Sequence, residues 1–167
     1  FNKSEKVTVI KQKLSQQIVN KLNKSFLVFF LNKKRDASKI LSNQKKLQKE
    51  NYSSLDKIKK IVFIAEKLIK QNNAKIVENF GALLSENWYL KKINNPNVSY
   101  KVVDKLYGTG MRSGSYGGKL LGAGGGGYFL FLANSESKKK MKSKFCNFST
   151  IDVEIHKDGT EIIYAHK

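Results

Sequence analysis

The feature that most constrains this chain is a glycine-rich segment that runs directly into an apolar one. Most of the twelve glycines lie between Gly108 and Gly127, the last four are consecutive, and the apolar run Tyr128–Leu132 follows at once. Glycine adopts positive φ and lets a backbone come close to another group, and successive N–H groups in such a loop can converge on an anion. The segment therefore predicts either a loop built for close backbone approach or a tight connection between two strands in which packing alone demands glycine.

Two nucleotide-binding motifs are excluded for this segment. Residues 122–127 fit G-x-G-x-x-G, but a dinucleotide site needs a helix after the glycines. Here a strand-like run follows instead. A Walker A loop is also excluded, because no Gly-Lys-Ser/Thr closes the segment. The glycines by themselves thus indicate that the backbone takes up positive φ or comes close to another group, but they do not identify a ligand.

Apolar periodicity predicts the remaining elements. A capping box at Ser53–Asp56 opens the second of three expected helices, and Asn94–Asn97, which contains the only proline, ends the third. We expect strands at 7–9, 25–31, 128–132, 151–155 and 162–165, a turn at 157–160, and helices over 16–24, three segments between 36 and 92 (the first marked by Ile40, Leu41 and Leu47), 99–107 and 135–147. This order predicts one α+β domain over residues 1–167, with a ferredoxin-like antiparallel sheet and a helical insert.

The net charge of +19 first suggests nucleic acid or an anionic surface as a partner. However, all but two of the 32 basic residues are lysines, the exceptions being Arg35 and Arg112. Proteins that read base sequence rely on the planar fork of arginine. The densest basic run, Lys138–Lys140, belongs to the solvent-exposed face of an expected amphipathic helix. We therefore favour a solvated lysine surface, with steering of an anionic substrate and a basic α+β nucleic-acid-binding module as alternatives.

Further residue types bound the function. No apolar run approaches the roughly 18–20 residues of a membrane span, so we expect no membrane partner. The single cysteine, Cys146, excludes an internal disulfide and indicates a reducing compartment, which favours a cytoplasmic protein. We expect Cys146 and Trp88 to be packing residues. His156 and His166 have no partner at metal-ligand spacing, so we expect both at the surface and no metal site in this chain.

Several segments, in order, resemble one known family. The sequence GGKLLGAGGGGYFLFL at 117–132 resembles the third conserved motif of the GHMP kinases. Segments 34–41, 81–92, 104–107 and 114–119, and the turn around Asp158-Gly159, resemble the branch of heptose 7-phosphate kinases and related sugar kinases. Two departures are that Leu31-Asn32 stands near the place of a Thr-Gly pair and that Ser115 stands where alanine is usual.

The resemblance implies that this chain is the C-terminal domain of an ATP-dependent sugar kinase that phosphorylates heptose 7-phosphate at its anomeric hydroxyl. In that family the phosphate-binding loop and the acidic catalytic residue lie in an N-terminal domain, which nothing in this sequence matches. The resemblance thus implies that ATP and Mg²⁺ are bound mainly by that missing domain, that no catalytic residue lies in this chain, and that the chain alone is inactive. The alternatives are the nucleic-acid-binding module and a remnant domain without catalysis. The oligomeric state stays open.

The resemblance also implies which residues contact the substrate or the phosphate loop. The glycine loop would line the cleft between the two domains, while a lysine and an arginine would bind the sugar phosphate. The alternative for the arginine is pairing at a helix start, and for the lysine a solvated position. The expected site residues are Gly122, Ala123, Gly124, Gly125, Gly126, Gly127, Lys119 and Arg35.

Overall fold

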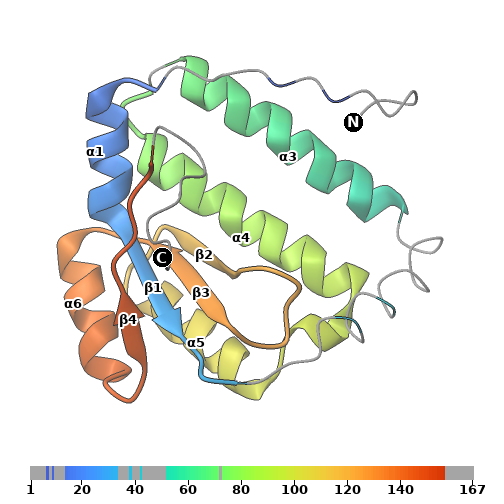
Figure 1. Cartoon of the computed structure of the whole chain (residues 1–167), viewed down its shortest axis with the longest axis vertical. Helices are drawn as coiled ribbons and strands as arrows, with labels where there is room; N and C mark the ends of the chain where they lie inside the picture. The colour runs from blue at the N-terminus through green and yellow to red at the C-terminus, as the bar shows by residue number, and fades with distance from the viewer. Residues whose placement is uncertain are drawn as a thin grey trace, which may run out of the picture.

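A computed structural model describes residues 14–33, 52–71 and 73–156 of the chain, together with residues 7, 9, 38 and 42 (Figure 1). Its centre is a four-stranded antiparallel sheet with the strand order β2-β3-β1-β4. The elements are α1 (Gln16–Ser25), β1 (Phe26–Phe30), α3 (Tyr52–Lys70), α4 (Ile76–Asn94), the 3₁₀ helix η2 (Pro96–Val98), α5 (Lys101–Arg112), β2 (Gly117–Leu120), β3 (Tyr128–Leu132), α6 (Ser135–Lys144) and β4 (Ser149–Ile151). The predicted α+β fold, a ferredoxin-like sheet with a helical insert between β1 and β2, is confirmed.

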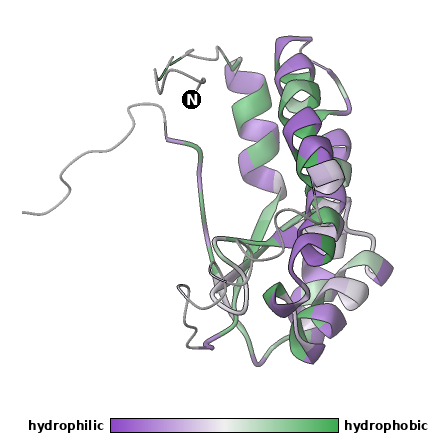
Figure 2. Cartoon of the chain, turned by 90° about the vertical axis from the view of Figure 1, so that its right-hand side faces the viewer, coloured by the Kyte–Doolittle hydropathy of each residue, from purple (hydrophilic) through white to green (hydrophobic). Residues whose placement is uncertain are grey.

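The main core lies between one face of the sheet and the helices. Phe29 of β1 pairs with Phe129 of β3 in the ladder, and both side chains are fully buried. The ring of Trp88 on α4 meets that of Phe129 edge to face at 6.0 Å, and Leu106 on α5 belongs to the same cluster. Figure 2 shows the helical layer to one side of the strands. Aromatic burial on this face therefore fixes the position of α4 and α5 against the sheet.

A second, smaller cluster holds α1 against the start of α4. Ile18 and Leu22 of α1 bury their side chains against Ile76 of α4. The hydroxyl of Ser15 caps α1 by accepting a hydrogen bond from the Ile18 N–H at 3.3 Å. At the other end, Lys138 Nζ on α6 donates to the carbonyl of Lys24 at 2.6 Å. At least one lysine of the basic run thus holds a helix end and is not merely solvated.

Most of the predicted elements that the structure describes are confirmed, with four differences. The strand expected at 151–155 is misplaced, because β4 is Ser149–Ile151 and its pairing with β1 ends at Ile151, opposite Val28. The capping box at Ser53 is wrong, because α3 already includes Tyr52, and the Ser54 hydroxyl instead donates to Asn94 Oδ1 at the end of α4. The helix expected over 99–107 continues to Arg112, because Gly110 allows it to pack on the ring of Phe131. The last predicted residues of the 135–147 helix lie beyond Lys144, where α6 ends.

Other predictions fall on residues that the structure does not describe. These are the helix marked by Ile40, Leu41 and Leu47, the turn at 157–160 and the strand at 162–165. Of the strand expected at 7–9 the structure describes Val7 and Val9, and both are exposed and outside any strand, so that prediction is not confirmed. Within the described part of the chain, no helix combines the length and apolar character needed to cross a membrane.

Candidate functional site

The glycine loop joins β2 to β3 and leaves the sheet near the carboxyl end of α4 (Figure 1). The two strands close behind it, since the Leu121 N–H donates to the Tyr128 carbonyl at 2.9 Å. Between these residues the backbone takes a course that depends on glycine. The loop glycines Gly122, Gly124, Gly125, Gly126 and Gly127 all have positive φ, between 64° and 159°.

The 3₁₀ helix η2 holds the middle of the loop. The Gly125 N–H donates to the Val98 carbonyl at 2.8 Å. Gly124, with a φ of 105°, passes so close to η2 that a Cβ there would lie 2.6 Å from Cβ of Val98. A side chain at 124 would thus be both strained and in collision. This contact explains physically why the middle of the loop is glycine.

The residues that follow β1 hold the far end of the loop. The Leu31 N–H donates to the Gly127 carbonyl at 2.8 Å. A Cβ at Gly126 would lie 2.7 Å from the carbonyl oxygen of Lys33. The Lys33 ammonium in turn lies 3.6 Å from the ring centroid of Tyr100, a cation–π contact. The chain after β1 is thereby fixed between the loop and Tyr100.

Helix α4 holds the near end of the loop and the strand that leads into it. Lys91 Nζ donates to the Gly122 carbonyl. Lys119 Nζ donates to Asn87 Oδ1, and the Gly118 N–H donates to Ser85 Oγ at 3.3 Å. These three α4 side chains bond to β2 and the loop in chain order. The helix therefore covers the outer edge of β2 and also anchors the loop.

Lys119 is half-buried, and this burial lowers the pKa of its ammonium. The alternative expectation of a solvated Lys119 is therefore wrong, because its amine is held by Asn87 beside α4. Arg35, the other residue expected to bind sugar phosphate, lies outside the described residues.

The loop is packed on one side and open on the other. Gly124 and Gly126 are buried, Ala123, Gly125 and Gly127 are half-buried, and Gly122 is exposed. Packing against η2 and Lys33 accounts for the two buried glycines, as the tight-connection alternative required. It does not account for the open side, where the loop offers backbone to a second body. The arrangement can serve chemically as a rigid backbone surface for another polypeptide or an anion.

The remaining predicted residues lie away from this loop. Trp88 is a core residue, as expected, and His156 is exposed, as expected. The prediction for Cys146 is wrong, because α6 ends at Lys144 and leaves the cysteine exposed in the turn that follows. His166 lies outside the described residues. Within the described ranges no three His, Cys, Asp or Glu side chains gather in a way that could hold a metal ion.

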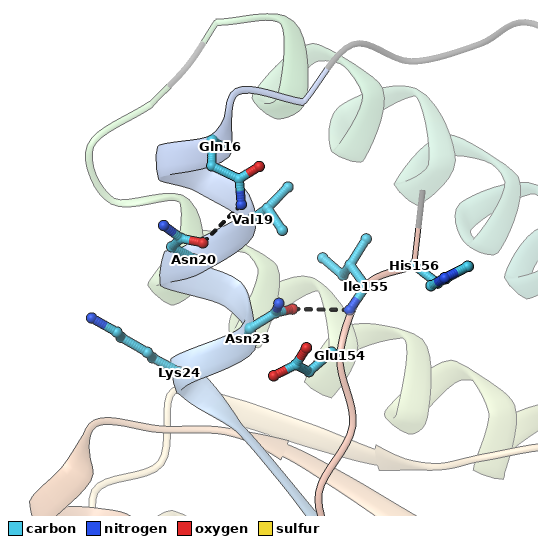
Figure 3. A pocket seen from close by; sticks show the side chains of 8 residues that line it. All are labelled: Gln16, Val19, Asn20, Asn23, Lys24, Glu154, Ile155 and His156. Carbon is cyan, nitrogen blue, oxygen red and sulfur yellow. Dashed lines mark hydrogen bonds between the residues drawn. The ribbon is translucent and has the colours of Figure 1, made fainter. Parts of the chain in front are cut away.

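A polar pocket of about 440 Å³ lies between α1 and the chain after β4 (Figure 3). Its walls are joined by a hydrogen bond from the Ile155 N–H to Asn23 Oδ1 at 3.0 Å, and Glu154 and His156 line one side. Because α1 packs on the first residue of α4, whereas Lys91 near the end of α4 holds the loop, pocket and loop lie at opposite ends of that helix. The pocket is therefore separate from the candidate site.

Sequence reasoning missed the residues that shape the loop. Val98 precedes the loop by a helix, a turn and a strand, Lys91 lies still earlier, in α4, and Lys33 lies three residues after the end of β1. None of them carries a motif by itself. A signal did exist at α4, since the segment 81–92 that resembles the kinase family contains Ser85, Asn87 and Lys91.

Comparison with known proteins gives this geometry a family context. Residues 65–149, which include the loop together with Lys91 and Val98, match the family described as GHMP kinases C terminal. The chain is 30% identical over 145 residues to the bifunctional fucokinase/GDP-fucose pyrophosphorylase of Arabidopsis thaliana, a match that covers 85% of this chain and 14% of that protein. It is 28% identical over 141 residues to the D-glycero-alpha-D-manno-heptose 7-phosphate kinase of Campylobacter jejuni, covering 83% of this chain and 40% of that protein.

A solved structure has the same fold. The crystal structure of the Methanococcus jannaschii mevalonate kinase aligns with a TM-score of 0.60 at 27% identity, covering 83% of this chain and 41% of that one. The chain thus spans less than half the length of each of these three relatives. The matched segment, the ferredoxin-like sheet and the clamped glycine loop together lead to one conclusion: the chain belongs to the GHMP kinase family, as one of its C-terminal domains.

Proposed function

We propose that this chain is the C-terminal half of an ATP-dependent sugar kinase and works together with a companion N-terminal half that binds the nucleotide. The pair is called the complete enzyme below. The observation that carries the proposal is the glycine loop, which is clamped by η2, α4 and the end of β1 and is open on its remaining side. A loop with these properties is suited to support the phosphate-binding loop of a second domain.

Phosphoryl transfer depends mainly on positioning and on stabilising charge. Rigidity in the supporting loop is therefore useful, because a displacement of the phosphate-binding loop would misalign the attacking hydroxyl and the γ-phosphate. ATP and Mg²⁺ supply the transferable phosphoryl group and neutralise its charge when bound. The described residues do not fit a resident magnesium site, since they bring no group of acidic ligands together. We therefore assign both the metal ion and the nucleotide to the companion half.

We propose heptose 7-phosphate as the substrate, with transfer to the anomeric hydroxyl. The Campylobacter jejuni relative is named as a kinase of that substrate and matches 83% of this chain. Lys119 and Arg35 are the proposed contacts to the sugar phosphate. Lys119 suits this role because it lies in β2 three residues before Gly122 of the loop, with its ammonium held in place by Asn87. Because such a kinase uses cytoplasmic ATP, we propose the cytoplasm as its location.

The nucleic-acid alternative is not favoured by the core. A ferredoxin-like sheet that binds RNA stacks bases on aromatic side chains of its open face. Phe129 and Phe131 point into the helix-covered core and are fully buried. They are thus out of reach of a base, and the exposed ring of Tyr128 on the opposite face already packs on Phe30, with centroids 5.1 Å apart.

The test is a kinase assay of the complete enzyme with ATP and three acceptors: heptose 7-phosphate, fucose and mevalonate. We expect phosphorylation of heptose 7-phosphate at the anomeric hydroxyl and none by this chain alone. Turnover of fucose only would replace the proposed substrate and keep the sugar kinase. Absence of any sugar phosphorylation would remove the proposed function.

A further inference from the structure

The face of the sheet opposite the main core is apolar as well. The ladder places Val28 of β1 between Leu130 of β3 and Ile151 of β4, so these three side chains share one face. Phe30 and Tyr128 form the next row, with ring centroids 5.1 Å apart. An antiparallel sheet with one solvated face usually carries polar residues there. Apolar residues in both rows indicate that a second layer covers this face.

A groove of about 420 Å³ runs across this face. Three of its residues expose a large share of their surface, namely Tyr128 at 43%, Ile151 at 40% and Val153 at 38%. No residue that lines it is charged, although the chain carries a net charge of +19. The lining residues are Phe26, Val28, Leu121, Tyr128, Leu130, Ile151 and Val153.

The one lysine in register with this face is turned away from it. Lys119 pairs with Leu130 in the ladder, yet its ammonium bonds to Asn87 of α4. The ammonium of Lys119 thus lies at the edge of the groove and not above it. A surface with this composition is suited to burial against apolar side chains, because an unpaired buried ammonium would be costly.

The groove is continuous with the glycine loop. Leu121 and Tyr128 line the groove, and they are also the residues immediately before and after the loop. A body that rests on the open side of the loop therefore lies at the mouth of the groove. This continuity connects the groove to the partner already proposed for the loop.

The size of the groove argues against a second copy of this chain as its occupant. A stable protein interface typically buries about 800 Å² and about 20–30 residues on each side. Seven lining residues fall well short of that number. The companion half is not limited to these seven residues, because it would contact the open side of the loop as well as the groove. In relatives of known length, moreover, 60% or more of the polypeptide lies outside the match to this chain.

We propose, resting on the function proposed above, that the groove is the docking surface for the companion N-terminal half. That half lays aliphatic or aromatic side chains over β1, between the groove residues of β3 and those of β4. The docked layer covers Ile151 and Val153 and ends at Leu121 and Tyr128, where the loop begins. The sheet face then holds the two halves together, while the loop supports the phosphates.

Cysteine reactivity tests this proposal. Ile151→Cys and, as a control, Val102→Cys are each made with Cys146→Ser, because Cys146 is itself exposed. Val102 lies on α5 and is 45% exposed, close to the 40% of Ile151. The rate of modification by a small maleimide is measured for this chain alone and for the complete enzyme. We expect similar rates for the two cysteines in the chain alone, and a rate for position 151 lowered by about tenfold or more only in the complete enzyme.

Each other outcome overturns the docking surface, and the kinase assay tells which proposal has failed. If position 151 stays reactive in a complete enzyme that phosphorylates its sugar, the proposed function stands and the docking surface is wrong. If it stays reactive and no sugar is phosphorylated, both proposals are wrong. If position 151 becomes less reactive in the chain alone as the chain concentration rises, the groove is covered by a second copy. Protection of the chain alone by a single-stranded RNA oligonucleotide assigns it to nucleic acid.

Discussion

The two faces of the β1–β3 pair are equally apolar in sequence but differ in their surroundings. Phe129 and Phe131 point into the helices and are fully buried, whereas Tyr128, the neighbour of Phe129, points into the groove and is 43% exposed. Strands of this kind are typical of sheets covered on both sides. The described helices α4, α5 and α6 provide one cover. On the groove face Val28 and Leu132 are already buried within the chain, so Tyr128 and Ile151 are among the residues that still expose surface for an assembly to bury.

Adjacent substitutions on β3 give the largest expected difference between the faces. Phe129→Ala removes a ring that lies 6.0 Å from Trp88 and 4.7 Å from Phe131. We expect it to lower the free energy of unfolding of this chain by about 3–5 kcal/mol. Tyr128→Ala removes a ring that packs on Phe30 but is 43% exposed, so we expect a smaller loss of about 1 kcal/mol. Urea unfolding followed by circular dichroism measures both, and equal losses would contradict the distinction between the faces.

The same contrast exists within the glycine loop. Gly124 is buried against Val98, whereas Gly122 is exposed. We expect Gly124→Ala to cost about 1–3 kcal/mol, from strained φ and from the collision with Val98. Gly122→Ala keeps only the left-handed strain of its φ of 64°, about 1 kcal/mol. Thermal unfolding of the two variants checks this order, and a larger loss at Gly122 would mean that the open side of the loop is packed.

The sequence was sufficient to predict β1 and β3 but not what covers them. The runs FLVFF and YFLFL are too uniformly apolar to be anything but buried strands, and both lie where they were predicted. The side that receives the helices depends on long-range packing, above all that of Trp88 and Leu106, which no local pattern records. The capping box at Ser53 failed because α3 already includes Tyr52, which puts Ser53 inside the helix, and the contact of the neighbouring Ser54 to Asn94 is likewise invisible to a local motif.

The glycine loop of the candidate site was predictable, but the residues that hold the loop in place were not. Dense glycine before a strand correctly indicated a loop with positive φ. The partner of Gly122 is Lys91, 31 residues earlier in the chain, and such a pairing has no signature in local sequence. Cys146 was predicted as a packing residue because an apolar residue next to Phe145 fits a helical stripe. The helix ends first, at Lys144, and the stripe with it.

Lys119 sits at the border between the two environments and gives a smaller expected effect. Burial lowers its pKa from 10.5, so the unfolded chain binds the proton more tightly than the folded chain does. Stability should therefore rise with pH in the window just below 10.5 in which only the unfolded chain is still protonated. Lys119→Met replaces the half-buried ammonium by an apolar group of similar length, and we expect it to change the stability at neutral pH by no more than about 1 kcal/mol.

Unfolding titrations of the wild-type chain and of Lys119→Met between neutral and alkaline pH measure this contribution. The substitution should remove part of the rise in stability. Lys139→Met on the exposed side of α6 is the control, since it also replaces a lysine by methionine but leaves the half-buried ammonium of Lys119 in place. If Lys119→Met has the same pH dependence as the wild type, the ammonium is solvated in spite of its bond to Asn87.

The smallest expected effect is on the open face of the isolated chain. Ile151→Ser shortens a side chain that is 40% exposed on the outermost strand, and Val102→Ser does the same at 45% exposure on α5. We expect each to change the free energy of unfolding of this chain alone by less than about 0.5 kcal/mol, as is usual for surface positions. In the complete enzyme the two should diverge, because only Ile151→Ser leaves a void under the docked layer. A common melting temperature for both variants in the complete enzyme would mean that the groove stays in solvent there. The apolar character of this face would then need a different cover.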